Sequence, residues 1–225
     1  MSRGKKIWDV LTPVIVFLLC NVVASAVVAS AVMAISGERT FAGIMEAVRS
    51  TALISTLLNF ALVIVVQMFF RRYDNRRFGK DERIWPAWKI IIGVLIVSVA
   101  GVAGNYLIQV SGLEDIFTFY QKIEDLTFSY QNPIILILTT VIIGPIAEEL
   151  TFRGLVQRRA RIWLKPGTAI VVSSLIFGLA HMNMIQLIYA FGIGLLLGYL
   201  YEKSGNLIAP ILAHMAANAV TIAIF

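Results

Sequence analysis

Long apolar runs, separated by short polar or charged segments, dominate the pattern of this 225-residue chain. A helix needs about 20 apolar residues to cross the hydrocarbon core of a bilayer. The runs occupy about residues 7–35, 50–70, 90–110, 133–153, 168–184, 186–201 and 207–225. This pattern predicts an all-α protein, a polytopic transmembrane bundle of about seven membrane helices in a single domain, 1–225. The fifth and sixth runs are short, so one of them is expected to be re-entrant or to lie in thinned lipid.

Two segments need a separate interpretation. The run at 7–35 follows a short basic N-terminus, as in a signal peptide. It is much longer than the usual apolar region of about 7–15 residues, so a retained helix is predicted. The segment 111–131 mixes five aromatic residues with four acidic ones. It is too charged to span the bilayer, and we expect an amphipathic segment on the membrane surface or a lid over a cavity.

Composition supports the membrane prediction. Hydrophobic residues make up 59% of the chain, charged residues 14%, and the mean hydropathy is +0.83. Soluble domains average about 45–50% apolar and about 25% charged residues. The net charge of +6 does not indicate nucleic-acid binding, because the basic residues cluster between the apolar runs. We expect membrane lipid and no nucleic acid among the partners. The single cysteine, Cys20, excludes an intrachain disulfide and a CxxC metal site.

The distribution of Lys and Arg predicts the orientation, because cytoplasmic segments of membrane proteins carry an excess of these residues. Four segments are assigned to the cytoplasm: the N-terminus, 71–89, 153–165 and 202–206. That side then holds 16 of the 19 Lys and Arg residues. The remaining three are Arg39, Arg49 and Lys122. We therefore expect a multi-pass protein of the cell membrane with a cytoplasmic N-terminus and with Phe225 outside.

Two adjacent carboxylates, Glu148 and Glu149, lie in the fourth run, where a lipid-facing helix should carry none. Ionisable groups at this depth cost about 2.5–3.5 kcal/mol or more, so they usually face a cavity or a partner. Glu149 shares a helix face with Arg153, four residues later, and these two are expected to pair. Adjacent residues diverge by about 100° around the axis, which leaves Glu148 free to face a cavity. Pro145 removes one backbone hydrogen bond and is expected to kink the helix.

Both histidines of the chain also lie in apolar runs, His181 in the fifth and His214 in the seventh. Phe177 lies one helical turn before His181, and Asn218 one turn after His214. At 1.5 Å per residue, Glu148 and both histidines reach similar depths, so they can meet in a pocket, which we expect to open toward the cytoplasmic side. A carboxylate and an imidazole can polarise a water there. A second imidazole and an amide can donate to the oxyanion that forms when water attacks a carbonyl.

Taken in order, these residues resemble the motifs of a family of intramembrane proteases. The motifs are Glu148-Glu149-x-x-x-Arg153, Phe177-x-x-x-His181 and His214-x-x-x-Asn218. Their flanks match as well, at Pro145-Ile146, Phe152-Arg153-Gly154 and Ala209-Pro210. The chain is thus similar to the CAAX protease and bacteriocin-processing family, also called Abi, over about 133–219. Residues 1–130 match only as generic membrane helices.

The resemblance implies a hydrolase, a CAAX prenyl endopeptidase-like protease that cleaves a peptide bond near the membrane surface. It implies that Glu148 and His181 activate water and that His214 and Asn218 stabilise the transition state. These residues lie on the fourth, fifth and seventh helices, and the supporting residues are Glu149, Arg153 and Phe177. Glu148, His181 and His214 would also suit zinc with an open fourth position, as in a metalloprotease. They lack the HExxH spacing, so the use of zinc stays open.

Two other classes of function stay open. A non-catalytic membrane protein that binds a peptide, such as a bacteriocin-immunity protein, would cut nothing. A proton-coupled transporter could use the glutamates and histidines as a relay, but such transporters usually contain internal repeats, and none is visible here. Within the protease interpretation the substrate is a peptide or a lipidated protein. A prenylated CAAX tail, a peptide pheromone or bacteriocin leader, and a membrane-anchored regulator all fit.

Overall fold

The computed structural model of this chain describes residues 2–37, 40, 42–43, 51–79, 85–113 and 133–224. All regular structure in these residues is helical, which confirms the all-α prediction. The first three helices are α1 (Arg3–Ser36), α3 (Ala52–Phe78) and α4 (Ala87–Ser111). The last three are α10 (Pro166–Ala180), α11 (Met184–Ser204) and α12 (Ile208–Ile224). The proposed amphipathic segment, 111–131, lies almost entirely outside the described residues.

A continuous helical rod lies between these two groups. Its parts are α7 (Pro133–Leu136), η1 (Ile137–Ile143), α8 (Gly144–Thr151), η2 (Phe152–Gln157) and α9 (Arg158–Ala160). η1 and η2 are π-helical, with wider turns in which an amide bonds to the carbonyl five residues back. With the rod counted as one helix, the described residues contain seven main helices, the number that the apolar runs predict. The sequence pattern did not predict the π-helical turns.

Five of these helices are long and apolar enough to cross a membrane, namely α1, α3, α4, the rod and α11. This supports a multi-pass membrane protein. The helices α10 and α12 are shorter, with 15 and 17 residues. The prediction that the sixth run is short was wrong, because α11 has 21 residues. Asn183 caps the start of α11, because its side-chain oxygen accepts hydrogen bonds from the amides of Ile185 and Gln186. Gly205 ends α11 in a left-handed conformation.

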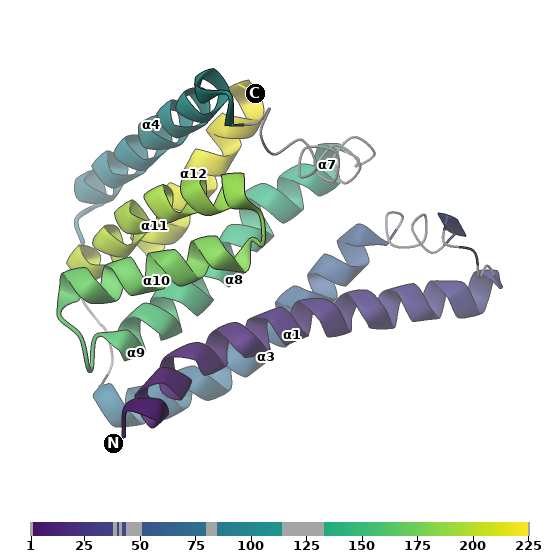
Figure 1. Cartoon of the computed structure of the whole chain (residues 1–225), viewed down its shortest axis with the longest axis horizontal. Coiled ribbons are helices and arrows are strands. Elements are labelled where there is room, and N and C mark those ends of the chain that lie inside the picture. The colour runs from purple at the N-terminus through teal and green to yellow at the C-terminus, as the bar shows by residue number, and fades with distance from the viewer. Residues whose placement is uncertain are drawn as a thin grey trace.

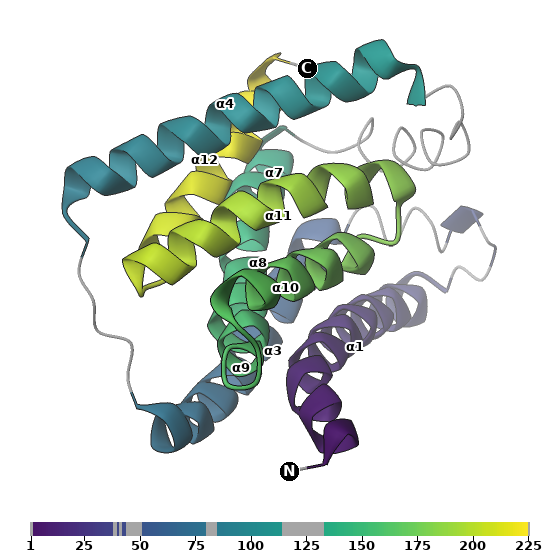
Figure 2. The same ribbon diagram turned by 60° about the vertical axis from the view of Figure 1, so that its left-hand side comes forward.

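Three pairs of helices pack around the rod (Figures 1 and 2). α1 pairs with α3, α10 with α11, and α4 with α12. α8 lies against α1, α3 and α12, while η2 lies against α1, α3, α10 and α11. The two glutamates of α8 therefore lie between the N-terminal helix pair and α12, the helix that carries His214 and Asn218.

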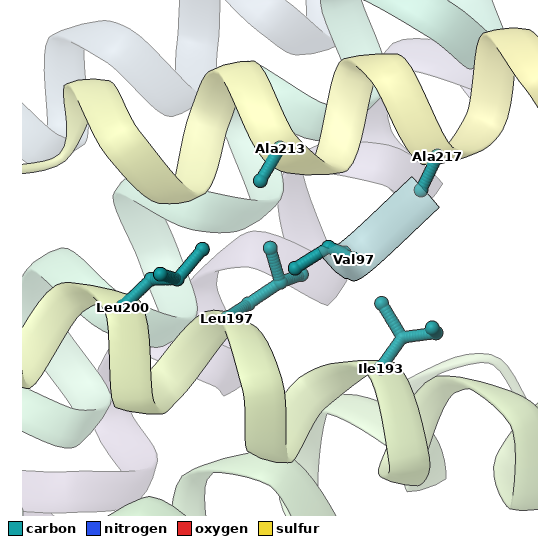
Figure 3. Close-up of a cluster of buried hydrophobic side chains, with 6 residues drawn as sticks. All are labelled: Val97, Ile193, Leu197, Leu200, Ala213 and Ala217. Atoms are coloured by element: carbon teal, nitrogen blue, oxygen red, sulfur yellow. The ribbon is translucent and has the colours of Figure 1, made fainter. Parts of the chain in front are cut away.

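The apolar core between α4, α11 and α12 depends on small residues. Figure 3 shows this cluster, which consists of Val97, Ile193, Leu197, Leu200, Ala213 and Ala217. The two alanines lie on α12 and are fully buried, so α12 can approach its neighbours closely. α11 approaches the rod in the same way through Gly194 and Gly198. A Cβ atom at Gly198 would lie 2.9 Å from both Gln157 Oε1 and Ile170 Cγ2.

Charged residues gather at one end of the bundle, which we call the basic end. α1 begins there, and α3, the rod and α11 end there (Figure 1). Ion pairs join these helix ends, among them Asp9–Arg77 at 3.1 Å, Asp74–Arg159 at 2.8 Å and Arg161–Glu202 at 3.0 Å. The segments that the distribution of Lys and Arg places on one side of the membrane are therefore in direct contact.

Candidate active site

Glu149 is the central carboxylate of a fully buried network. Its Oε1 lies 2.8 Å from Arg153 Nη1 and 2.9 Å from His214 Nδ1. The side chains of Glu149 and Arg153 are both 0% exposed. The pair with Arg153 has the geometry that the four-residue spacing predicts. The bond to His214 joins α8 to α12 across 65 residues of sequence, and local spacing could not predict it.

Arg153 is held by three different groups. Besides the Glu149 carboxylate, its Nη2 donates to the Gly194 carbonyl at 3.0 Å. Its guanidinium also lies 4.6 Å from the centroid of the Phe177 ring, within the range of a cation–π interaction. Arg153 thus compensates the buried charge of Glu149 and ties the rod to α10 and α11.

His214 lies between the two carboxylates. Its Nδ1 bonds to Glu149, and its Nε2 lies 3.7 Å from Glu148 Oε2. The Glu148 side chain is 23% exposed and lines a cavity, whereas Glu149 does not. Two adjacent carboxylates therefore have different surroundings: one is locked by an arginine and a histidine, and the other is accessible.

His181 lies at the C-terminal end of α10. Its Nδ1 is 2.9 Å from the Phe177 carbonyl oxygen. Because a carbonyl can only accept, Nδ1 carries the hydrogen, and in the neutral ring Nε2 has a free lone pair. The next residue, Met182, has a φ of 52°, a conformation rare for a residue with a side chain. The helix stops there, so His181 lies at its end beside the cavity.

Asn218 bonds to a backbone carbonyl of the rod. Its Nδ2 donates to Thr140 O at 2.9 Å. η1 explains why this carbonyl is free. The amide of Gly144 bonds to Thr139 O, five residues back, so the next amide in the same register would come from residue 145. That residue is Pro145, which has no N–H. Pro145 was expected to free a carbonyl, and the carbonyl it leaves free in this register is the one that Asn218 binds.

A cavity of about 450 Å³ brings these side chains together. Glu148, Phe177, His181, His214 and Asn218 all line it. α1 and α3 supply a second part of the wall, where Asn59 Nδ2 donates to Asn21 Oδ1 at 2.8 Å. These two asparagines were missed at the sequence level. Their signal was present, because each is an uncharged polar residue inside an apolar run.

The lining gives no support to a cavity that opens at the basic end. Within the described part of the chain, none of the lining residues is a lysine or an arginine. Between Glu148 and the basic end, every residue of 151–160 is buried, and Phe152 and Arg153 are fully enclosed. The rod and its neighbours therefore close the path from the basic end to the glutamates.

The residues considered for zinc do not form a ligand set in this arrangement. Among the residues that the structure describes, no group of three or more His, Cys, Asp or Glu side chains could hold a metal ion. One nitrogen of each histidine is engaged, His181 Nδ1 with the Phe177 carbonyl and His214 Nδ1 with Glu149, which leaves Nε2 of each ring for other contacts.

Comparison with known proteins gives matches mainly to the part of the chain that forms this site. Residues 130–220 match the family model described as type II CAAX prenyl endopeptidase Rce1-like. No solved structure matches the chain.

Three curated relatives are similar to the chain. YdiL of Bacillus subtilis, which bears the provisional name of membrane peptidase, is 26% identical over 166 residues, covering 70% of this chain and 65% of YdiL. YpbD of the same organism, an uncharacterised protein, is 36% identical over 92 residues, or 39% of this chain and 43% of YpbD. MroQ of Staphylococcus aureus, a membrane-embedded CAAX protease, is 28% identical over 138 residues, or 58% of this chain and 54% of MroQ. The chain thus spans less than two thirds of each relative.

Proposed function

Through residues 130–220 this chain belongs to the CAAX protease and bacteriocin-processing family, and on that premise we propose that it is an intramembrane endopeptidase. The proposed substrate is a membrane-associated or lipidated peptide or protein. The proposed reaction is hydrolysis of one peptide bond by a water molecule that Glu148 and His181 activate.

One observation carries this proposal. Glu148, His181, His214 and Asn218 come from three separate helical segments and line a single cavity. Glu149, beside Glu148 in sequence, is excluded from that cavity by its bonds to Arg153 and His214. Glu148 is a partly exposed carboxylate that lies 3.7 Å from the His214 imidazole and lines the same cavity as the His181 imidazole. These are the groups that general-base activation of water requires.

The proposed steps conserve protons and bonds. Water gives a proton to the Glu148 carboxylate, and its oxygen bonds to the carbonyl carbon of the substrate. The His181 Nε2 lone pair accepts the second hydrogen bond of that water and orients it. The carbon–nitrogen bond then breaks as Glu148 returns the proton to the leaving amine. The products are a carboxylic acid and an amine, and transfer of the acid proton to the amine gives a carboxylate and an ammonium group.

His214 and Asn218 are proposed to stabilise the oxyanion of the tetrahedral intermediate. As an imidazolium, His214 would donate to Glu149 from Nδ1 and to the oxyanion from Nε2. The Asn218 amide gives one hydrogen to Thr140 O and keeps a second for the substrate. The bond to Thr140 fixes the amide before the substrate arrives, and such preorganisation is the basis of oxyanion stabilisation.

The test compares membrane peptides from cells that lack the gene with those from cells that carry wild-type or variant protein. Glu148→Gln keeps the size of the side chain but removes the base, so cleavage should fall by about 10²–10⁴-fold. His181→Ala should approach the same loss, and Asn218→Ala should cost about 10²–10³-fold.

Glu202→Gln is the matched control, because it makes the same change at the basic end, away from the cavity. It should leave the peptide pattern unchanged. Processing that continues in a Glu148→Gln protein present at the wild-type level would overturn the proposed function. A peptide-binding protein without catalysis would give identical peptide patterns for all variants.

A further inference from the structure

The cavity and the basic end lie in opposite directions from Glu148, and this bears on where the substrate comes from. The α-helical rise of 1.5 Å per residue gives upper limits of about 15 Å for Glu148 and about 28 Å for Thr139, each measured from Arg158 along the rod, because its π-helical turns rise less per residue. The hydrocarbon core is about 30 Å thick. The cavity thus begins near mid-depth and continues away from the basic end.

The lining residues on the other helices also place the cavity away from the basic end. The lining residue Asn59 of α3 is about 27 Å from Arg77 along its helix. Gln186, at the start of α11, is about 25 Å from Lys203. Thr56 and Ile222 also line the cavity, near the start of α3 and the end of α12. Helices from three parts of the chain therefore extend the cavity to the end opposite the basic residues, and we call this end of the cavity its mouth.

Neutral polar groups characterise this mouth. Among the residues that the structure describes, the polar lining residues other than Glu148 and the histidines carry only amide or hydroxyl groups, among them Asn21, Thr56, Asn59, Thr139, Gln186 and Thr221. Amides and hydroxyls can both donate to and accept from a polypeptide backbone. They offer no charge to neutralise an acidic or basic ligand. The mouth therefore suits an extended peptide segment that satisfies its backbone groups on the wall.

We infer that the catalytic cavity opens to the non-cytoplasmic face and that the substrate is an extended polypeptide segment on that face. The basic end is cytoplasmic by the excess of Lys and Arg, and the dense region 151–160 closes the cytoplasmic approach. The substrate is then an exported peptide, or the external segment of a membrane protein. This inference rests on the proposed function for the identity of the ligand, but the direction of access does not depend on catalysis.

Accessibility to a membrane-impermeant charged maleimide tests the direction. Cys20 is the only native cysteine, so Cys20→Ala gives a background without thiols. Thr56→Cys and Ile222→Cys then report on the mouth from two different helices. Lys165→Cys reports on the basic end, where this side chain is exposed. Each protein is labelled in intact spheroplasts and again after permeabilisation.

Thr56→Cys and Ile222→Cys should be labelled to the same extent before and after permeabilisation, and Lys165→Cys only afterwards. Labelling of all three only after permeabilisation would mean that the cavity opens to the cytoplasm and would overturn the inference. Labelling of Lys165→Cys in intact spheroplasts would reverse the orientation and overturn it too. Two reporter positions guard against the failure of one variant to fold.

The same labelling in a Glu148→Gln background separates the two proposals. If external labelling persists there while peptide processing is unchanged from wild type, the access inference stands and the proposed function fails. If processing is lost but the mouth is labelled only after permeabilisation, the proposed function stands and the access inference fails.

Discussion

Replacing Glu149 by glutamine tests whether its charge serves stability while Glu148 serves chemistry. The glutamine side chain would have nearly the same shape, and its carbonyl oxygen could still accept from Arg153 and His214. The change leaves the Arg153 guanidinium without its ion-pair partner in a site that is 0% exposed. Breaking a buried ion pair in this way typically costs about 3–5 kcal/mol.

Two contacts put the expected loss at the lower end of that range. Arg153 keeps its bond to the Gly194 carbonyl and its position over the Phe177 ring. We therefore expect a loss of about 3 kcal/mol in the free energy of unfolding. For a chain of this size each kcal/mol shifts Tm by about 2–4 °C, so Tm should fall by about 6–12 °C. Thermal unfolding of the detergent-solubilised protein, followed by tryptophan fluorescence, measures this shift.

Glu202→Gln is the control for this experiment as well. It breaks the ion pair between Glu202 and Arg161. The Arg161 side chain is 35% exposed and the Glu202 side chain 20% exposed. Exposed pairs contribute about 0–1 kcal/mol, so Tm should fall by less than about 4 °C. A loss for Glu149→Gln no larger than that of Glu202→Gln would refute the reasoning. Adding Arg153→Met to Glu149→Gln should recover much of the lost stability, because the unpaired buried charge is then gone.

Two further predictions concern the rod and its neighbours. Gly198→Ala should lower the free energy of unfolding by about 1–3 kcal/mol, because its Cβ would meet Gln157 and Ile170 at 2.9 Å. Gly192 lies on the same helix, and a Cβ atom there would have no atom within 4 Å. Gly192→Ala should therefore raise the free energy of unfolding by about 0.5–1 kcal/mol. Equal shifts in Tm for the two variants would contradict this packing. Pro145→Ala supplies an N–H that competes with Asn218 for Thr140 O, so turnover should fall while expression and Tm hold. Full activity of Pro145→Ala would show that the Asn218–Thr140 bond does not depend on the missing amide.

Local spacing predicted the parts of the site that lie on one helix. Glu149 and Arg153 pair, and His181 bonds back to Phe177, because residues four apart face each other. The Glu149–His214 bond could not be read from the sequence, because it depends on how closely α12 approaches α8. That approach is a property of the packed bundle, in which α12 contacts α4, α11 and α8.

The polar partners of the rod were also beyond the sequence pattern. Pro145 indicated a missing hydrogen bond, but the free carbonyl could be identified as Thr140 only once the π-helical register was known. A π turn has no distinctive composition, so the hydropathy pattern contains no trace of it. The direction of the cavity could not be predicted from the sequence either. Apolar runs predict the depth of a residue along its helix, but they do not predict which helix faces leave a space between them.

The wall of the cavity has two separate origins in the chain. The chemical groups lie within residues 130–220, while Phe17, Asn21, Thr56, Asn59 and Phe60 on the opposite wall belong to the helix pair α1 and α3, outside that region. Substitutions in this pair can reshape the recess without touching the groups that we propose to act on the peptide bond. Selectivity and chemistry can therefore diverge independently in evolution. A chimera that exchanges α1 and α3 between two such proteins should change which peptide is cut while the cleavage reaction stays the same.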